Sequence, residues 1–172
     1  PATALRVNYI AFRDGNWKAG VQASPGSTGN TGPTGFGWRP NIGMFCSTAQ
    51  TSFNSFSADG TLGYGWALSS SSRWAIAYSD KDNADTSVCK SRMTASKCIQ
   101  VINHDSSILL DADFVSFDSS GFTINMTTVT SGAKIGYLMG QIDKAALGTF
   151  QSPTSAATDT VISGLAFTPD LA

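Results

Sequence analysis

The stretch Leu62-Gly63-Tyr64-Gly65-Trp66-Ala67-Leu68 decides the fold of this chain. Its bulky residues alternate with glycine and alanine, and Arg73-Trp74-Ala75-Ile76-Ala77-Tyr78 repeats the alternation after four serines. Successive side chains of a β-strand point to opposite faces, so each stretch predicts a strand whose bulky residues share one face. A hairpin through residues 69–72 would bring the two sets together. We therefore expect the bulky residues to form a core face, leaving the small residues for another sheet or a neighbouring chain to cover.

Most other apolar segments are short and have the same period of two. We expect further strands at residues 8–12, 17–21, 98–102, 108–110, 112–117, 122–126 and 134–138. Residues 24–34 contain mainly Gly, Ser, Thr, Asn and Pro, which predicts a surface loop. About a dozen short strands with turn signals every 8 to 12 residues predict an all-β fold, an antiparallel β-sandwich with a jelly-roll-like arrangement.

The chain carries a partial internal repeat, at about residues 7–44 and 135–172. Val7-Asn8-Tyr9-Ile10 returns as Ile135-Gly136-Tyr137-Leu138, and Gly, Ser-Pro and Gly-x-x-x-x-Pro elements follow in the same order. The offset of 128 residues, from Val7 to Ile135, suits one small domain better than a solenoid repeat. We expect a β-sandwich unit over 1–140, and over 141–172 the opening strands of a second copy. These strands, including one near Asp143–Leu147, would pack on the first unit or be lent to a neighbouring subunit.

The composition argues against several classes of partner. Only 13% of the residues are charged, against about 25% in ordinary soluble domains, and 11 basic residues nearly balance 12 acidic ones. This balance predicts no binding to nucleic acid or to an anionic membrane. No apolar run approaches the 18 or so residues of a membrane span, and no signal peptide is recognised. Because Pro1 cannot be a translational start, we expect a chain that was processed or cut from a longer one.

The three cysteines are an odd number, so they cannot all pair within the chain. Cys89 and Cys98 flank a polar stretch that resembles a hairpin tip, where they would be either bridged or both reduced. Cys46 follows an apolar run and is most simply a small buried residue.

Candidate catalytic and metal-binding residues are few. His104, the only histidine, stands in Asn103-His104-Asp105-Ser106, where adjacent residues cannot face one another as a triad, so we expect a solvated turn. Asp80–Asp85 holds three carboxylates and could bind calcium, but it departs from the EF-hand spacing and favours a hydrated turn.

Three further sets of residues have both a functional and a structural interpretation. Asp111 and Asp113 would share one strand face, as a glycosidase pair does, but nothing places them in a cleft and a solvent face is the simpler expectation. Asn125-Met126-Thr127 is a formal glycosylation sequon within a strand. The four tryptophans could form a sugar-stacking platform, although their alternation favours the core. They are Trp17, Trp38, Trp66 and Trp74.

Several stretches together resemble the tandem β-sandwich repeat modules of tailed-phage structural proteins. They are Tyr9–Phe12, Gly35–Pro40, Ser72–Ala77 and Phe114–Asn125, with Gly136-Tyr137-Leu138. The resemblance spans about residues 7–140, but Tyr137-Leu138-Met139-Gly140-Gln141 departs from the Tyr-Leu-Ala-Leu-Gly-Gly ending of such modules. It implies a building block of a tail, a fibre or a capsid decoration, and it supplies no catalytic residues. From the residues themselves we also expect no catalytic, cofactor-binding or metal-binding site.

These observations favour a non-enzymatic structural protein of a virion or extracellular assembly. We expect it to act by associating with copies of itself or by packing on other virion proteins. The alternative is a carbohydrate-binding module that attaches to host-surface glycans through exposed aromatic residues. A hydrolase that uses Asp111 and Asp113 is a third hypothesis.

Overall fold

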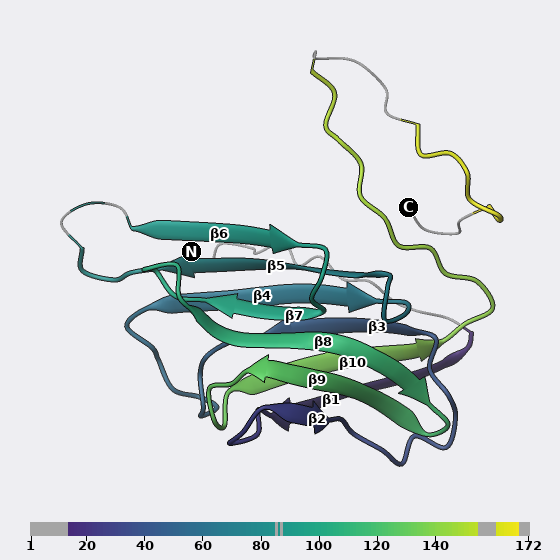
Figure 1. Ribbon diagram of the computed structural model, residues 1–172, viewed down its shortest axis with the longest axis horizontal. Helices are drawn as coiled ribbons and strands as arrows, with labels where there is room; N and C mark the ends of the chain where they lie inside the picture. The colour runs from purple at the N-terminus through teal and green to yellow at the C-terminus, as the bar shows by residue number, and fades with distance from the viewer. Residues whose placement is uncertain (1–13, 85, 87, 155–160, 169–172) are drawn as a thin grey trace, which may run out of the picture.

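The computed structural model shows two antiparallel sheets packed face to face (Figure 1). It describes residues 14–84, 86, 88–154 and 161–168. No residue of these ranges is helical, and the prediction of an all-β sandwich is confirmed. Within the same ranges, no helix has the length and apolar character needed to cross a membrane.

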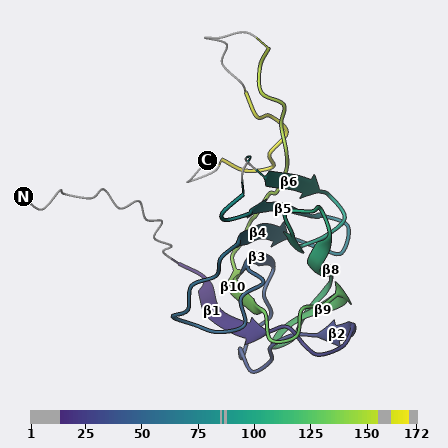
Figure 2. The same cartoon turned by 90° about the vertical axis from the view of Figure 1, so that its left-hand side faces the viewer.

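The two sheets differ in size. The larger has six strands in the order β1 (Asn16–Ala23), β10 (Lys134–Gln141), β3 (Ile42–Ser47), β4 (Gly60–Ala67), β5 (Arg73–Asp80) and β6 (Cys89–Thr94). The smaller has four in the order β2 (Gly29–Thr31), β9 (Gly121–Thr128), β8 (Ile108–Asp118) and β7 (Ile99–Ile102). The edge-on view separates β2, β8 and β9 from the strands of the larger sheet (Figure 2).

The core lies between the sheets. It is built from the inward side chains of β3, β7, β8, β9 and β10, among them Phe45, Val101, Leu110, Phe114, Phe122, Ile124, Met126, Ile135 and Met139. Phe36, Trp38 and Tyr137 pack against this cluster, and the Phe122 ring meets the Phe45 ring edge-on with centroids 5.6 Å apart. Burial of about ten large apolar side chains is what holds the two layers together.

The apolar runs 108–110 and 112–117 form one long strand, β8, where we expected two. The register against β9 shifts between Asp111 and Ala112 and again between Phe114 and Ser116. Each irregularity interrupts the alternation, which is why Leu110, Asp111 and Ala112 are buried in succession. The predicted turn at 118–121 is confirmed as the β8–β9 hairpin.

The prediction for β4 and β5 is wrong in one respect, since the buried face is the one with the small residues. Gly63, Gly65, Ala67, Ala75 and Ala77 all point inward and are buried. A Cβ atom on Gly65 would overlap the Cys98 carbonyl oxygen, and one on Gly63 would overlap that of Gln100. The backbone leading into β7 and through it therefore lies directly on the glycines, and the bulky side chains are left on the outside.

Two other segments differ from expectation. The stretch between Cys89 and Cys98 is no hairpin tip, because residues 89–94 form the edge strand β6 and the chain then crosses to β7 in the other sheet. No disulfide joins the two cysteines. The loop at 24–34 contains the short strand β2, whose neighbour Gly32 has no room for a side chain against the Phe122 carbonyl.

The expected second copy of the internal repeat forms no strand after β10 in residues 142–154 and 161–168, which are the described part of that segment. Ile135–Leu138 lies in β10, between β1 and β3, while the first copy's Val7–Ile10 and the expected strand at 8–12 lie outside the described residues. The expected strand near Asp143–Leu147 is not formed, because this segment leaves the sheet and makes no ladder (Figure 1). Lending of residues 141–172 to a neighbouring subunit stays a prediction.

Candidate functional site

The outward side of the six-stranded sheet, which we call the aromatic face, carries bulky apolar side chains that do not belong to the core cluster. Alternation along each strand places its members on one side, and the strand register brings Trp66 opposite Trp74 and Tyr64 opposite Ile76. Its members are Trp17, Val21, Ile42, Met44, Cys46, Leu62, Tyr64, Trp66, Trp74, Ile76, Tyr78, Met93, Gly136 and Leu138.

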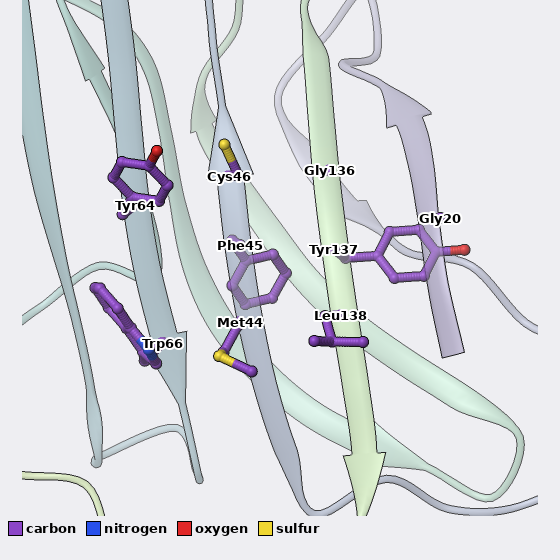
Figure 3. A pocket seen from close by; sticks show the side chains of 9 residues that line it. All are labelled: Gly20, Met44, Phe45, Cys46, Tyr64, Trp66, Gly136, Tyr137 and Leu138. Atoms are coloured by element: carbon purple, nitrogen blue, oxygen red, sulfur yellow. The ribbon is translucent and has the colours of Figure 1, made fainter. Parts of the chain in front are cut away.

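A shallow depression of about 360 Å³ crosses the middle of the aromatic face. It passes over Cys46 and Gly136 and is bordered by Tyr64, Trp66 and Leu138 (Figure 3). The absence of a side chain at Gly136 and the small side chain of Cys46 beside it create the depression, since Tyr64, Trp66 and Leu138 around them are large. Its lining is almost wholly apolar and holds no charged residue, which suits an apolar side chain rather than a polar ligand.

At the β6 edge, the aromatic face ends in a short chain of hydrogen bonds. The Tyr78 hydroxyl donates to Cys89 Sγ over 3.6 Å, and Cys89 Sγ donates to Asp80 Oδ1 over 3.2 Å. The bond to Cys89 raises the pKa of the Tyr78 phenol. Partial burial raises the pKa of the Cys46 thiol from its usual value of 9.0, although a hydrogen bond with Tyr64 opposes the effect. Cys46, expected to be buried, is exposed in the depression, and its thiol stays protonated at neutral pH.

The tryptophans divide between the two sides of the sheet. Trp38 packs on the core, but Trp17, Trp66 and Trp74 lie on the aromatic face and are only partly buried, so the expected core position is wrong for these three. The rings of Trp66 and Trp74 have centroids 4.3 Å apart and planes inclined by 30°. Trp74 Nε1 is buried without a hydrogen-bond partner, so this donor is not available to a ligand at the surface.

Asp111 and Asp113 form ion pairs rather than lining a cleft. Asp113 lies on the outward side of the four-stranded sheet, as expected, but Asp111 is buried. Lys97 Nζ lies 3.8 Å from Asp111 Oδ2 and 3.2 Å from Asp113 Oδ2, and Arg73 lies 3.1 Å from Asp113. Burial raises the pKa of Asp111, while hydrogen bonding by Gln100 and the charge of Lys97 lower it. With both carboxylates held by cations, the arrangement neutralises buried charge and offers no exposed acid and base.

His104 belongs to a contact between loops. Its Nδ1 lies 3.4 Å from Asp59 Oδ2 without the alignment of a hydrogen bond, and its side chain is largely buried, so the expected solvated turn is wrong for the ring. Asp105 accepts hydrogen bonds from the Ser107 hydroxyl and backbone amide, which lower the pKa of that carboxyl. The side chains of Asn103, Asp105 and Ser106 therefore form no triad with the histidine.

The carboxylates of Asp80 and Asp82, in the loop considered for calcium, accept hydrogen bonds from neighbouring residues of the protein. Asp80 accepts from Cys89, Asp82 accepts from the Asn83 amide, and Asp85 lies outside the described residues. Among the residues that the structure describes, no group of three or more His, Cys, Asp or Glu side chains could hold a metal ion.

The outward side of the four-stranded sheet is polar. Lys97 donates to Asp113 and Thr127, and Asp118 accepts from Ser116 and Thr123. Asn125 of the sequon lies within β9 between β2 and β8, as expected. This side therefore has the hydrogen-bonded, charge-paired character of a solvated sheet face.

Comparisons with known proteins identify no relative, since no family model, no curated protein and no solved structure matches this chain.

The sequence analysis missed the aromatic face because it assumed that the bulky side chains of β4 and β5 would be the buried ones. The signal that could have found it is the row of glycine and alanine on β4 and β5, which permits a backbone to approach closely.

Proposed function

We propose that the chain is a non-enzymatic structural module of a virion or extracellular assembly, and that it works by packing its aromatic face against another protein surface. One observation carries this proposal: a six-stranded sheet presents a continuous apolar side to solvent although its other side already covers the core. Soluble monomers rarely expose contiguous apolar patches larger than a few hundred Å², and larger patches mark interaction sites.

The surroundings of the aromatic face support the same function. The depression carries no charge, and the carboxylates considered for catalysis are engaged in ion pairs. The apolar centre of a protein interface is depleted of charge and enriched in Trp, Tyr and Met, which is the composition found here. The phage-like stretches, in particular Phe114–Asn125, support a virion as the setting.

The direct test is the assembly state of the full chain. Sedimentation velocity over a hundredfold range of concentration should show a discrete oligomer, and electron microscopy of the same samples should show particles of uniform size. A single monomeric species throughout, which also fails to bind the other proteins encoded beside it, would contradict the proposal.

A carbohydrate-binding module is the second candidate, because aromatic rings on a flat sheet can stack on sugar rings. Tyr64 and Tyr78 are about half exposed, and they follow the Trp66 and Trp74 pair along the same face of the hairpin. Such a site also needs polar groups that fix the sugar hydroxyls, and the depression beside Tyr64 supplies almost none.

Retention of the chain on insoluble polysaccharides separates the two candidates. A carbohydrate module would bind to one of them, and Tyr64→Ala would abolish the binding without changing the oligomer. For an assembly module we expect no retention, while Tyr64→Ala weakens association.

A further inference from the structure

The aromatic face is close to electrically neutral over its whole extent. Of the strand residues on this side, the charged ones are Asp80, where β5 ends, and Lys134, where β10 begins. They have opposite signs and lie at the rim, and Lys134 Nζ already lies 5.2 Å from the centre of the Phe53 ring. Two copies could therefore bring their aromatic faces together without opposing like charges at the centre.

The exposed area matches what an interface between copies needs. The fractional exposures are 47% for Tyr64, 39% for Ile76, 45% for Tyr78, 65% for Met93, 53% for Val21 and 37% for Leu62. At about 150 to 250 Å² for each fully exposed large side chain, these six expose on the order of 600 Å². The partly buried residues of the same face, Trp66 and Trp74 among them, bring the total toward the roughly 800 Å² that each partner of a standard interface buries.

The shape of the aromatic face also suits a second sheet of the same kind. Two twisted sheets stack about 10 Å apart with strands inclined by about 30°, and their side chains interdigitate. The depression over Cys46 and Gly136 gives one copy room for a bulky side chain of the other. The polar outward side of the four-stranded sheet, with its Lys97–Asp113–Thr127 contacts, lacks this character.

We propose that the aromatic face is the interface through which two copies of this chain pack sheet to sheet, with the depression over Cys46 and Gly136 receiving an apolar side chain of the second copy. This inference rests on the proposed function and names its partner. Ile76 lies between Tyr64 on β4 and Met93 on β6, in the most exposed part of the aromatic face. Residues 142–154, which leave the sheet after β10, lie outside the proposed interface.

The test is sedimentation velocity of the full chain carrying Ile76→Lys, compared with Val115→Lys. Both residues are β-branched and both are 39% exposed, but Val115 lies on β8 of the other sheet. We expect Ile76→Lys to raise the dimer dissociation constant by about thirtyfold or more, as removal of a central contact does. Val115→Lys should leave the constant unchanged, and so should Phe56→Lys in the fully exposed loop before β4.

A second measurement covers the case in which Ile76→Lys fails to fold. Maleimide labelling of the wild-type chain, read by peptide mass spectrometry, should modify Cys46 more slowly as the concentration rises through the dissociation constant. The rate for unassociated chain, extrapolated from dilute samples, is the reference. Labelling of Cys46 that does not change between monomer and dimer would overturn the inference.

The remaining outcomes separate the inference from the proposed function. If the dimer persists in folded Ile76→Lys but is lost in a variant with Phe150→Ser and Ile162→Ser, association runs through the exposed tail. The inference then fails while the proposed function stands. If the wild-type chain is monomeric at every concentration and binds no virion protein, both fail.

Discussion

The two sides of the β4–β5 hairpin are opposites in size and in burial. The inward side is buried along its run of glycine and alanine, from Gly63 to Ala67 and from Ala75 to Ala77, while the outward side carries Tyr64, Trp66 and Ile76 and is open to solvent. The small residues are buried because the backbone of Cys98, just before β7, lies almost directly on Gly65, and that of Gln100 in β7 lies on Gly63. The difference shows that burial in this sandwich follows the closeness of the neighbouring layer, and not the size of the side chain.

A Gly65→Ala substitution should produce the largest effect, because the new Cβ atom would overlap the Cys98 carbonyl oxygen. We expect a loss of about 3 kcal/mol or more in the free energy of unfolding, at the upper end of overpacking effects. Urea denaturation followed by tryptophan fluorescence measures it. Gly60→Ala on the same strand is the control, since its Cβ atom would lie 3.8 Å from Asp80 Cβ in ordinary contact. If both variants lost the same free energy of unfolding, close packing of the two layers at Gly65 would not explain the effect.

Replacement of Lys97 by Ala tests the ion pairs where the two sheets meet. Asp111 and Asp113 would keep their partly buried positions without this cation, and we expect a loss of about 1 to 2 kcal/mol at neutral pH. Urea denaturation at a series of pH values measures it.

The pH dependence of the Lys97→Ala loss has a definite sign. Burial raises the folded pKa of Asp111 above 3.8, so on acidification the folded chain takes up this proton before the unfolded chain does. The unfavourable contribution of the charged Asp111 therefore falls as the pH drops through the raised pKa. The difference between the variant and the wild type should shrink in the same range, and a difference that grows on acidification would contradict this account.

Trp66→Ala tests the outward side of the β4–β5 hairpin, where we expect a smaller loss of stability than in the core. The variant loses the contact with the Trp74 ring, whose centroid lies 4.3 Å away, but opens no internal cavity. We expect a loss of about 1 kcal/mol in the monomer, well below the 3 to 5 kcal/mol of a core aromatic such as Phe114→Ala. Thermal unfolding of dilute samples measures both variants. A Trp66 loss as large as that of Phe114 would mean that the aromatic face belongs to the core.

Ile76→Thr should have the smallest effect on the monomer. The residue keeps its β-branched shape on a strand and is already partly hydrated, so we expect a change within about 0.5 kcal/mol. The same substitution should weaken association measurably, which thermal unfolding alone would miss and sedimentation would detect. A large loss of monomer stability would show that Ile76 packs within its own chain.

The sequence by itself determined the class of fold and most of the strands. The period-two alternation in residues 62–68 and 73–78 predicts pleated strands, which the structure has as β4 and β5. The turn residues at 118–121 predict the hairpin that joins β8 and β9.

Only the tertiary structure decided which side of each alternating strand is buried and which residues far apart in the sequence come into contact. A period of two defines two faces but does not say which one a second layer will cover, and that depends on where β7 lies. The ion pairs of Lys97 with Asp111 and Asp113 and the contact of His104 with Asp59 likewise require segments far apart in the chain to meet. Glycine at positions 63 and 65 permits that approach because it leaves the space that a side chain would fill.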